Sequence, residues 1–243
     1  MSNNKNRIMK SLLLLGIVFA SFFLCARQKE LLCSCDPEID KIVRNNISEV
    51  QVMDRTQWLN IEKQDLQRGY YVAFSSEQKH TFWKEKLAEV LELDWSEQER
   101  AHLLILVDFL EKNPQMFSPD KNQKADDTFD LFMYRWQDDA KEKLGWNKKM
   151  LYAIAATGNK MLNKAGDIAS ASDSNHPLVK SRSESGSGSG WKNCSCSTKQ
   201  DFCDLTGEFQ QRCREDSGCN LNYRNCGWLM QQACDGNCRH LWA

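Results

Sequence analysis

Cysteine content constrains the fold of this chain more than any other feature of its sequence. Eight of the eleven cysteines lie in the C-terminal segment, among Asn, Ser, Thr, Gly and Asp residues that favour turns: Cys194, Cys196, Cys203, Cys213, Cys219, Cys226, Cys234 and Cys238. A core this small rarely supplies more than ~3–5 kcal/mol, whereas each disulfide adds ~2–4 kcal/mol. We therefore expect residues 193–243 to form a small disulfide-rich domain. Eight cysteines permit about 105 pairings, so the connectivity stays open.

Zinc binding is the alternative use of so many thiols. Cys194 and Cys196 could share a metal ion, but structural zinc sites usually present cysteine pairs two to four residues apart, twice over. Only Cys234 and Cys238 come near that spacing, and His240 is the one histidine of the segment. The sequence therefore favours disulfides and predicts neither a metal site nor a cofactor.

Residues 1–26 have the layout of a secretory signal peptide. Three basic residues precede an apolar run from Ser11 to Ala26, and the chain then turns abruptly polar. Cleavage after Ala26 would remove Cys25 and leave an even set of cysteines suited to full pairing. We expect the export machinery to deliver the protein outside the cytoplasm, where disulfides persist.

Two alternatives for this segment would leave the protein anchored to a membrane. The uncleaved apolar run could serve as an anchor, although it is shorter than the ~20 residues that span a bilayer. Lipoprotein cleavage before Cys25 would attach a lipid instead. The bulky Leu24 disfavours this second route, because a small residue usually precedes the lipidated cysteine.

Helical patterns dominate residues 27–162, and no useful strand alternation interrupts them. One helix begins at Ser75 or Ser76, and another begins at Ser96, where Glu99 completes a capping-box pattern. A third covers 127–144, and weaker stretches cover 37–52, 54–66 and 148–162. We expect an all-α domain, a helical bundle with its own core, that could act as a pro-region.

Residues 163–192 are rich in Ser and Gly and nearly devoid of large apolar residues. This composition is typical of a flexible linker. We therefore expect the helical domain and the disulfide-rich domain to be mechanically independent.

Charge excludes some partners. The chain has 32 Lys+Arg and 33 Asp+Glu, and loss of the three basic signal residues (32 − 3 = 29) leaves it mildly acidic. Six Lys+Arg and six Asp+Glu lie between Trp191 and Ala243. We expect no nucleic-acid binding and no strongly cationic, membrane-lytic segment.

Four motifs of the cysteine-rich segment combine cysteines with specific neighbours: Asn-Cys-Ser-Cys-Ser-Thr at 193–198, Asp-Phe-Cys at 201–203, Cys-Gly-Trp at 226–228 and Cys-Asp-Gly-Asn at 234–237. In these motifs, over about residues 193–238, the segment resembles the bacteriocin fulvocin C and the fulvocin C-related family. The resemblance implies a secreted antibacterial peptide whose eight cysteines are all half-cystines. Its partner would be an envelope component of a competing bacterial cell.

Two tryptophans of this segment are candidate target contacts, because an indole ring combines an apolar body with a polar edge. They are Trp228 and Trp242. For Trp228, packing inside the domain is the interpretation that we favour, whereas Trp242 lies in the tail and stays open.

The Cys-Ser-Cys motif at the start of the cysteine-rich segment, residues 194–196, occurs a second time at Cys33-Ser34-Cys35. Chance explains so short a match. The functional alternative is that Cys33 and Cys35 bridge into the helical domain or exchange with the tail.

Catalysis has little support, because the four histidines lie in unrelated contexts and no nucleophile, base and orienting group stand together. We expect no enzyme. Two classes of function remain: an exported precursor of an antibacterial peptide, and a cell-surface binding or adhesion protein with a disulfide-rich recognition module on a flexible stalk.

Overall fold

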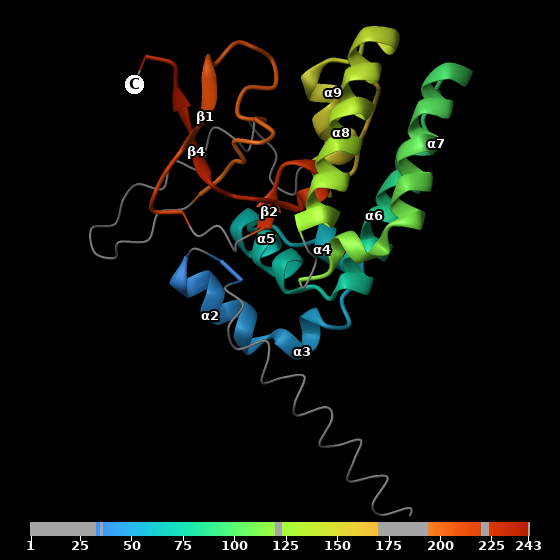
Figure 1. Cartoon of the computed structure of the whole chain (residues 1–243). Helices are drawn as coiled ribbons and strands as arrows, with labels where there is room; N and C mark the ends of the chain where they lie inside the picture. Colours follow the sequence, from blue (N-terminus) through green and yellow to red (C-terminus); the bar gives the residue numbers. More distant parts are fainter. Residues whose placement is uncertain (1–32, 35, 120–122, 170–193, 220–223, 243) are drawn as a thin grey trace, which may run out of the picture. The chain divides into compact units, whose positions relative to one another are not determined.

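A computed structural model describes residues 33–34, 36–119, 123–169, 194–219 and 224–242 (Figure 1). Helices occupy the N-terminal part of this range, and four disulfides with short strands occupy the C-terminal part. The predicted fold class is thereby confirmed. The predicted signal peptide and most of the predicted linker lie outside the described residues.

We call residues 36–169 the helical part. Its elements are α2 (Pro37–Asn45), α3 (Ile47–Val50), α4 (Arg55–Leu59), α5 (Gln64–Ala73), α6 (Ser76–Leu91), α7 (Glu97–Lys112), η2 (Pro114–Phe117), α8 (Gln123–Leu144) and α9 (Lys148–Ala155). Ser75 and Ser96 cap α6 and α7 through capping boxes, as the sequence predicts. The weaker stretches are shorter or broken: the first divides at Asn46, the second at Asn60, and the third ends at Ala155.

Aromatic side chains fill the core of the helical part. Trp58, Tyr71 and Phe82 pack edge to face, with the Phe82 ring centroid 4.9 Å from that of Trp58 and 5.3 Å from that of Tyr71. Further along, His102 stacks on Trp136 at 5.1 Å, and its Nε2 lies 2.9 Å from the Trp136 carbonyl oxygen. His102 is thus a buried packing residue of α7, and burial lowers its pKa.

The helical part continues beyond the predicted start of the linker. Met161 and Ile168 form an isolated antiparallel bridge, the Ala169 amide donates to the Lys160 carbonyl, and Lys149 pairs with Asp167. Residues 163–169 therefore fold back on the helices. Their polar composition hides this, because the turn is held by backbone hydrogen bonds and one ion pair rather than by apolar side chains.

We call residues 194–242 the cysteine-rich part. Strand β1 (Gln211–Glu215) pairs antiparallel with β4 (Gly236–His240), with Cys213 opposite Cys238. A second ladder joins β2 (Arg224–Cys226) to β3 (Gln232–Ala233) around the short helix η3 (Trp228–Met230). The isolated bridge between Cys196 and Gly236 adds the start of this part to β4.

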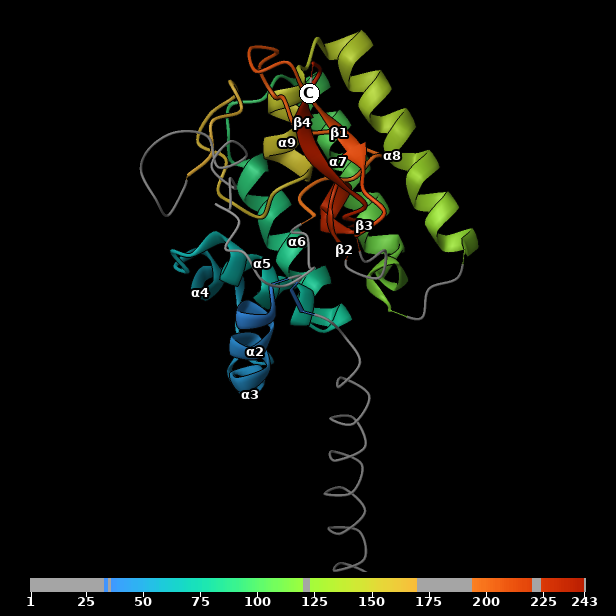
Figure 2. The ribbon, with the colours of Figure 1, turned by 90° about the vertical axis from the view of Figure 1, so that its left-hand side faces the viewer.

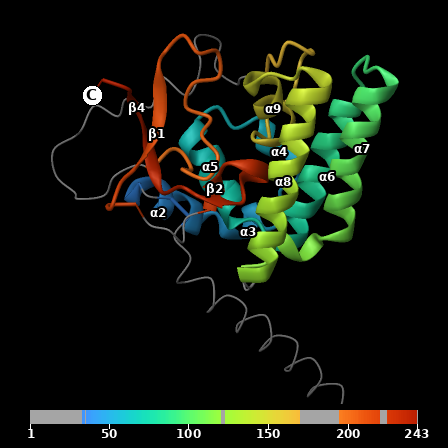
Figure 3. The ribbon, with the colours of Figure 1, turned by 45° about the horizontal axis from the view of Figure 1, so that its top comes forward.

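The two parts share one hydrophobic core. Buried residues of the cysteine-rich part, among them Phe202 and Trp228, belong to the same cluster as the aromatic residues of the helices. Figures 1 and 3 show β2 against α5 and close to α8, and Figure 2 shows the strands from another side. Residues 33–243 form one compact unit. The expected mechanical independence is therefore wrong, because the composition of a linker says nothing about whether the segments that it joins pack together.

No helix among the described residues is both long enough and apolar enough to cross a membrane.

Candidate functional site

All eight predicted half-cystines are paired. The disulfides are Cys194–Cys219, Cys196–Cys213, Cys203–Cys238 and Cys226–Cys234. The first three close loops with sequence separations of 25, 17 and 35 residues, and the fourth closes a short loop with a separation of 8. The cysteine-rich part is thus a small disulfide-stapled module, and its bridges suggest an extracellular location.

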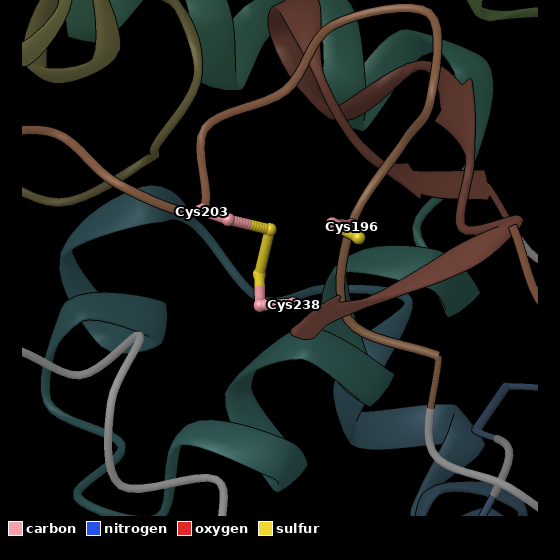
Figure 4. A group of neighbouring side chains, drawn as sticks. All are labelled: Cys196, Cys203 and Cys238. Carbon is pink, nitrogen blue, oxygen red and sulfur yellow. A yellow bond between two sulfur atoms is a disulfide. The ribbon is translucent and has the colours of Figure 1, made fainter. Parts of the chain in front are cut away.

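Two of the bridges lie against each other (Figure 4). The sulfur atoms of Cys196, Cys203 and Cys238 all lie within 4.8 Å of one another. Figure 4 shows the Cys203–Cys238 bond, with Cys196 beside it. The Cys196 sulfur is bonded to Cys213, so none of the three is a thiolate, which is the form of sulfur that binds metal. The cluster instead ties β1 and β4 to the start of the cysteine-rich part.

The fourth bridge closes a tight loop whose backbone is unusual. Gly227, Leu229 and Met230 have φ angles of 62°, 48° and 52°, in the left-handed region. Gly227, at φ 62° and ψ −150°, has a backbone conformation that favours glycine, and a Cβ atom there would lie 1.7 Å from Oε1 of Gln232 unless that side chain moved. At Leu229 and Met230 the conformation costs on the order of 1–3 kcal/mol each, and the surrounding contacts must offset it.

This loop carries most of a buried apolar face. We call the set Phe202, Leu205, Trp228, Leu229 and Met230 the docking face. The ring of Trp228 meets Trp136 of α8 edge to face at 6.1 Å, and Phe202 meets Tyr152 of α9 at 5.4 Å. Phe202 and Trp228 also contact each other at 4.9 Å. The docking face therefore packs on the helical part and is covered by it.

The two candidate tryptophans have opposite environments. Trp228 is only 2% exposed, so it cannot reach a target in this form of the protein, and the packing interpretation fits its place. Its neighbours are aromatic rings rather than disulfides alone. Trp242 is 87% exposed, and its Nε1 donates to Oε1 of Gln210 at 3.1 Å.

Tyr71 of α5 is the polar anchor of the docking face. Its fully buried hydroxyl donates to the Leu229 carbonyl oxygen at 3.0 Å and accepts from Nε1 of Trp83 at 2.8 Å. Nε2 of Gln231 donates to the same hydroxyl at 3.1 Å. Burial raises the pKa of Tyr71, which keeps the phenol protonated and able to donate.

Ion pairs and polar contacts lie at the edge of the docking face. Arg224 forms a bidentate pair with Asp126, with both N···O distances at 3.1 Å. Lys199 pairs with Asp130, whose other carboxylate oxygen accepts from Nε2 of Gln232 at 3.2 Å. Both aspartates belong to α8, so in these two pairs the helix supplies the anion and the cysteine-rich part supplies the cation.

Arg68 of α5 contacts the fourth bridge directly. Its Nη2 lies 3.4 Å from the sulfur of Cys226 and 3.5 Å from that of Cys234, and its carbonyl oxygen accepts from Nδ2 of Asn225 at 3.1 Å. A small cleft of about 80 Å³ opens along this seam, with Tyr152 and Gln200 in its lining. The cleft has room for a few water molecules.

Comparison with known proteins found no match among protein-family models, curated proteins or solved structures.

Cys33 is buried beside Gly69. Its amide donates to Oδ1 of Asp40 at 2.7 Å, and burial raises the pKa of its thiol to about 11. Cys35 lies outside the described residues, and none of the four bridges above includes Cys33. The alternative to a chance match, in which Cys33 and Cys35 bridge into the helical domain or exchange with the tail, stays a prediction.

Sequence analysis missed the helical half of this site. Tyr71, Trp136, Asp126 and Asp130 carry no motif, and each fits an ordinary helix pattern. For Trp228 a signal existed in Cys-Gly-Trp-Leu at 226–229, where a glycine next to a cysteine indicates a tight turn.

Proposed function

We propose that this chain is the exported precursor of a cysteine-rich antibacterial peptide, in which the helical part acts as a pro-region. The activity would reside in about residues 193–243, within which about residues 193–238 resemble the fulvocin C-related family. The observation that carries the proposal is the covered docking face, because a pro-region that guides folding or keeps a toxin latent must bind the segment that it serves.

The disulfides supply the mechanism of recognition. Four bridges hold the cysteine-rich part in a fixed shape, so little conformational entropy is lost when it binds a target. The six Lys+Arg and six Asp+Glu between Trp191 and Ala243 give no excess of cations for anionic lipid to attract. We infer recognition by shape of an envelope component on a competing cell.

A cell-surface binding or adhesion protein is the second candidate. The exposed indole of Trp242, next to the β1–β4 ladder, is the observation that favours it. In this case the intact chain would bind its target through the outer surface of this ladder. The cysteine-rich part would then act while docked rather than as a knob on a stalk.

Growth inhibition and cell binding separate the two candidates. The whole chain would be purified without reductant and cut between residues 170 and 192, and its fragments would be separated in denaturant and returned to buffer. Inhibition of related bacteria by the oxidised C-terminal fragment, lost after reduction and alkylation, supports the precursor. Binding of the intact chain to cells, abolished by Trp242→Ala and without any inhibition, would replace it with the second candidate.

A further inference from the structure

We infer that the helical part is a binding site for a disulfide-stapled peptide and retains the cysteine-rich part after the chain is cut. Cleavage between residues 170 and 192 would then leave a one-to-one complex of two fragments, and release would require the docking face to separate from α5, α8 and α9. Retention after the cut depends only on the contacts between the two parts. Its consequence, that cleavage by itself does not activate the peptide, rests on the proposed function.

Apolar burial holds the docking face on the helical part. Trp228 is 2% exposed and Leu229 is fully buried, although both belong to a module of about 50 residues that cannot enclose a large core of its own. Their cover comes from the helical part, where Trp136 meets the Trp228 ring. Separation would expose this face to water, so the hydrophobic effect opposes it.

Buried hydrogen bonds also hold the two parts together. The Leu229 carbonyl oxygen accepts from Tyr71, and Asn225 donates to the Arg68 carbonyl oxygen. Opening the interface breaks these bonds together, in a place where the apolar surroundings make each of them costly to lose. The hydrogen bonds also fix one orientation of the cysteine-rich part on the helices.

The strained loop works against retention. Leu229 and Met230 keep left-handed backbone conformations in the docked state, and the Leu229 carbonyl oxygen accepts from Tyr71 of the helical part. A separated module loses that contact, so any relaxation of the loop that the Cys226–Cys234 bridge permits would favour the separated state. The apolar and polar contacts of the docking face therefore have to exceed this strain.

Complementary charges at the edge of the docking face help to orient the cysteine-rich part. Arg224 and Lys199 meet Asp126 and Asp130 at the edge of the docking face. The Arg224 and Lys199 side chains are 42% and 55% exposed, so salt screens these pairs and they add orientation more than affinity. The complex should therefore survive high salt.

The test uses the whole chain with a protease site placed in the Ser/Gly-rich stretch 183–190. After complete cleavage without reductant, size-exclusion chromatography and native mass spectrometry would be run in 0.15 M and 1 M NaCl. We expect both fragments in one particle of one-to-one stoichiometry at both salt concentrations. Two separate fragments in either buffer would overturn the inference.

Single substitutions show which residues of the interface hold the two fragments together. Trp228→Ala should weaken association by at least about 30-fold, as a central buried tryptophan does in other interfaces. Trp242→Ala is the matched control and should leave association unchanged. Lys199→Ala should cost less than about fivefold. Equal effects of Trp228→Ala and Trp242→Ala would contradict the docking face as the source of affinity.

Tyr71→Phe keeps the test decisive if Trp228→Ala does not fold. This variant retains the ring and removes only the hydroxyl that holds the Leu229 carbonyl, so we expect association about tenfold weaker. Unchanged association would show that this contact does not hold the fragments.

The two proposals fail in different ways. If the cut fragments stay together but the separated C-terminal fragment inhibits no bacterium, the binding inference stands and the antibacterial function falls. If the fragments part at once and the C-terminal fragment inhibits growth, the function stands and retention is wrong.

Discussion

Replacing Lys86 by methionine should stabilise the protein near neutral pH and remove part of its pH dependence. Lys86 lies on α6 with its side chain fully buried, and its Nζ donates to the Asn159 carbonyl oxygen at 2.5 Å. Burial, aided by the positive charge of Arg55, lowers the pKa of this lysine from 10.5 to about 7. The folded protein therefore holds the Lys86 proton less tightly than the unfolded chain does.

The sign of the effect follows from proton linkage. Below pH 7 both states carry the proton, and burying the charged amine costs up to about 5 kcal/mol, taking ~1.4 kcal/mol for each unit of pKa change. Between pH 7 and 10.5 only the unfolded chain stays charged, so this group makes the protein more stable as pH rises. Above 10.5 the penalty is gone.

The variant Lys86→Met removes this penalty but leaves the Asn159 carbonyl without its donor, which costs about 1–3 kcal/mol. Below pH 7 we expect Lys86→Met to exceed the wild type by about 2–4 kcal/mol in free energy of unfolding. The difference should shrink by about 2 kcal/mol between pH 7 and 9. Guanidinium titrations followed by tryptophan fluorescence, without reductant, at each pH unit from 6 to 9 would measure it.

Lys84→Met is the matched control, because Lys84 lies on the same helix with 47% of its side chain exposed and pairs with Glu111 at 3.4 Å. We expect it to change the free energy of unfolding by less than about 1 kcal/mol. If the difference in free energy of unfolding between Lys86→Met and the wild type stays constant from pH 6 to 9, Lys86 does not lose its proton on folding as we infer.

Other substitutions test the docking face through stability. Trp228→Ala should lower the free energy of unfolding of the intact chain by about 3–5 kcal/mol, against less than about 0.5 kcal/mol for Trp242→Ala, and equal losses in denaturant titrations would be inconsistent with the shared core. Tyr71→Phe should cost about 1–3 kcal/mol because the Leu229 carbonyl oxygen loses its Tyr71 donor and Nε1 of Trp83 loses its acceptor, and a neutral result in calorimetry would argue against these hydrogen bonds. Asp126→Asn should cost at most about 1 kcal/mol, an effect that should shrink in 1 M NaCl; an undiminished effect would mean that the pair with Arg224 is better shielded than its exposure implies.

Local patterns in the sequence determined the helices and the use of the cysteines. Ser75 and Ser96 cap α6 and α7 because a side-chain oxygen three residues before a free amide is a local geometry, independent of the rest of the fold. Dense cysteines in a segment too small for a core of its own predict disulfides for a similar reason. Neither inference needs a distant residue.

Pairing and docking were decided only by the tertiary structure. Cys196 bonds Cys213 while Cys203 bonds Cys238, and all of these sulfurs gather at one place, because the β1–β4 ladder brings Cys213 opposite Cys238. The spacing of cysteines cannot reveal that register. The shared core is equally nonlocal: Trp228 and Trp136 are 92 positions apart (228 − 136 = 92), and nothing near either residue in the sequence points to the other. Such contacts form because the docking face and the helices each have apolar surface that neither can bury alone, and that surface becomes visible only once both have folded.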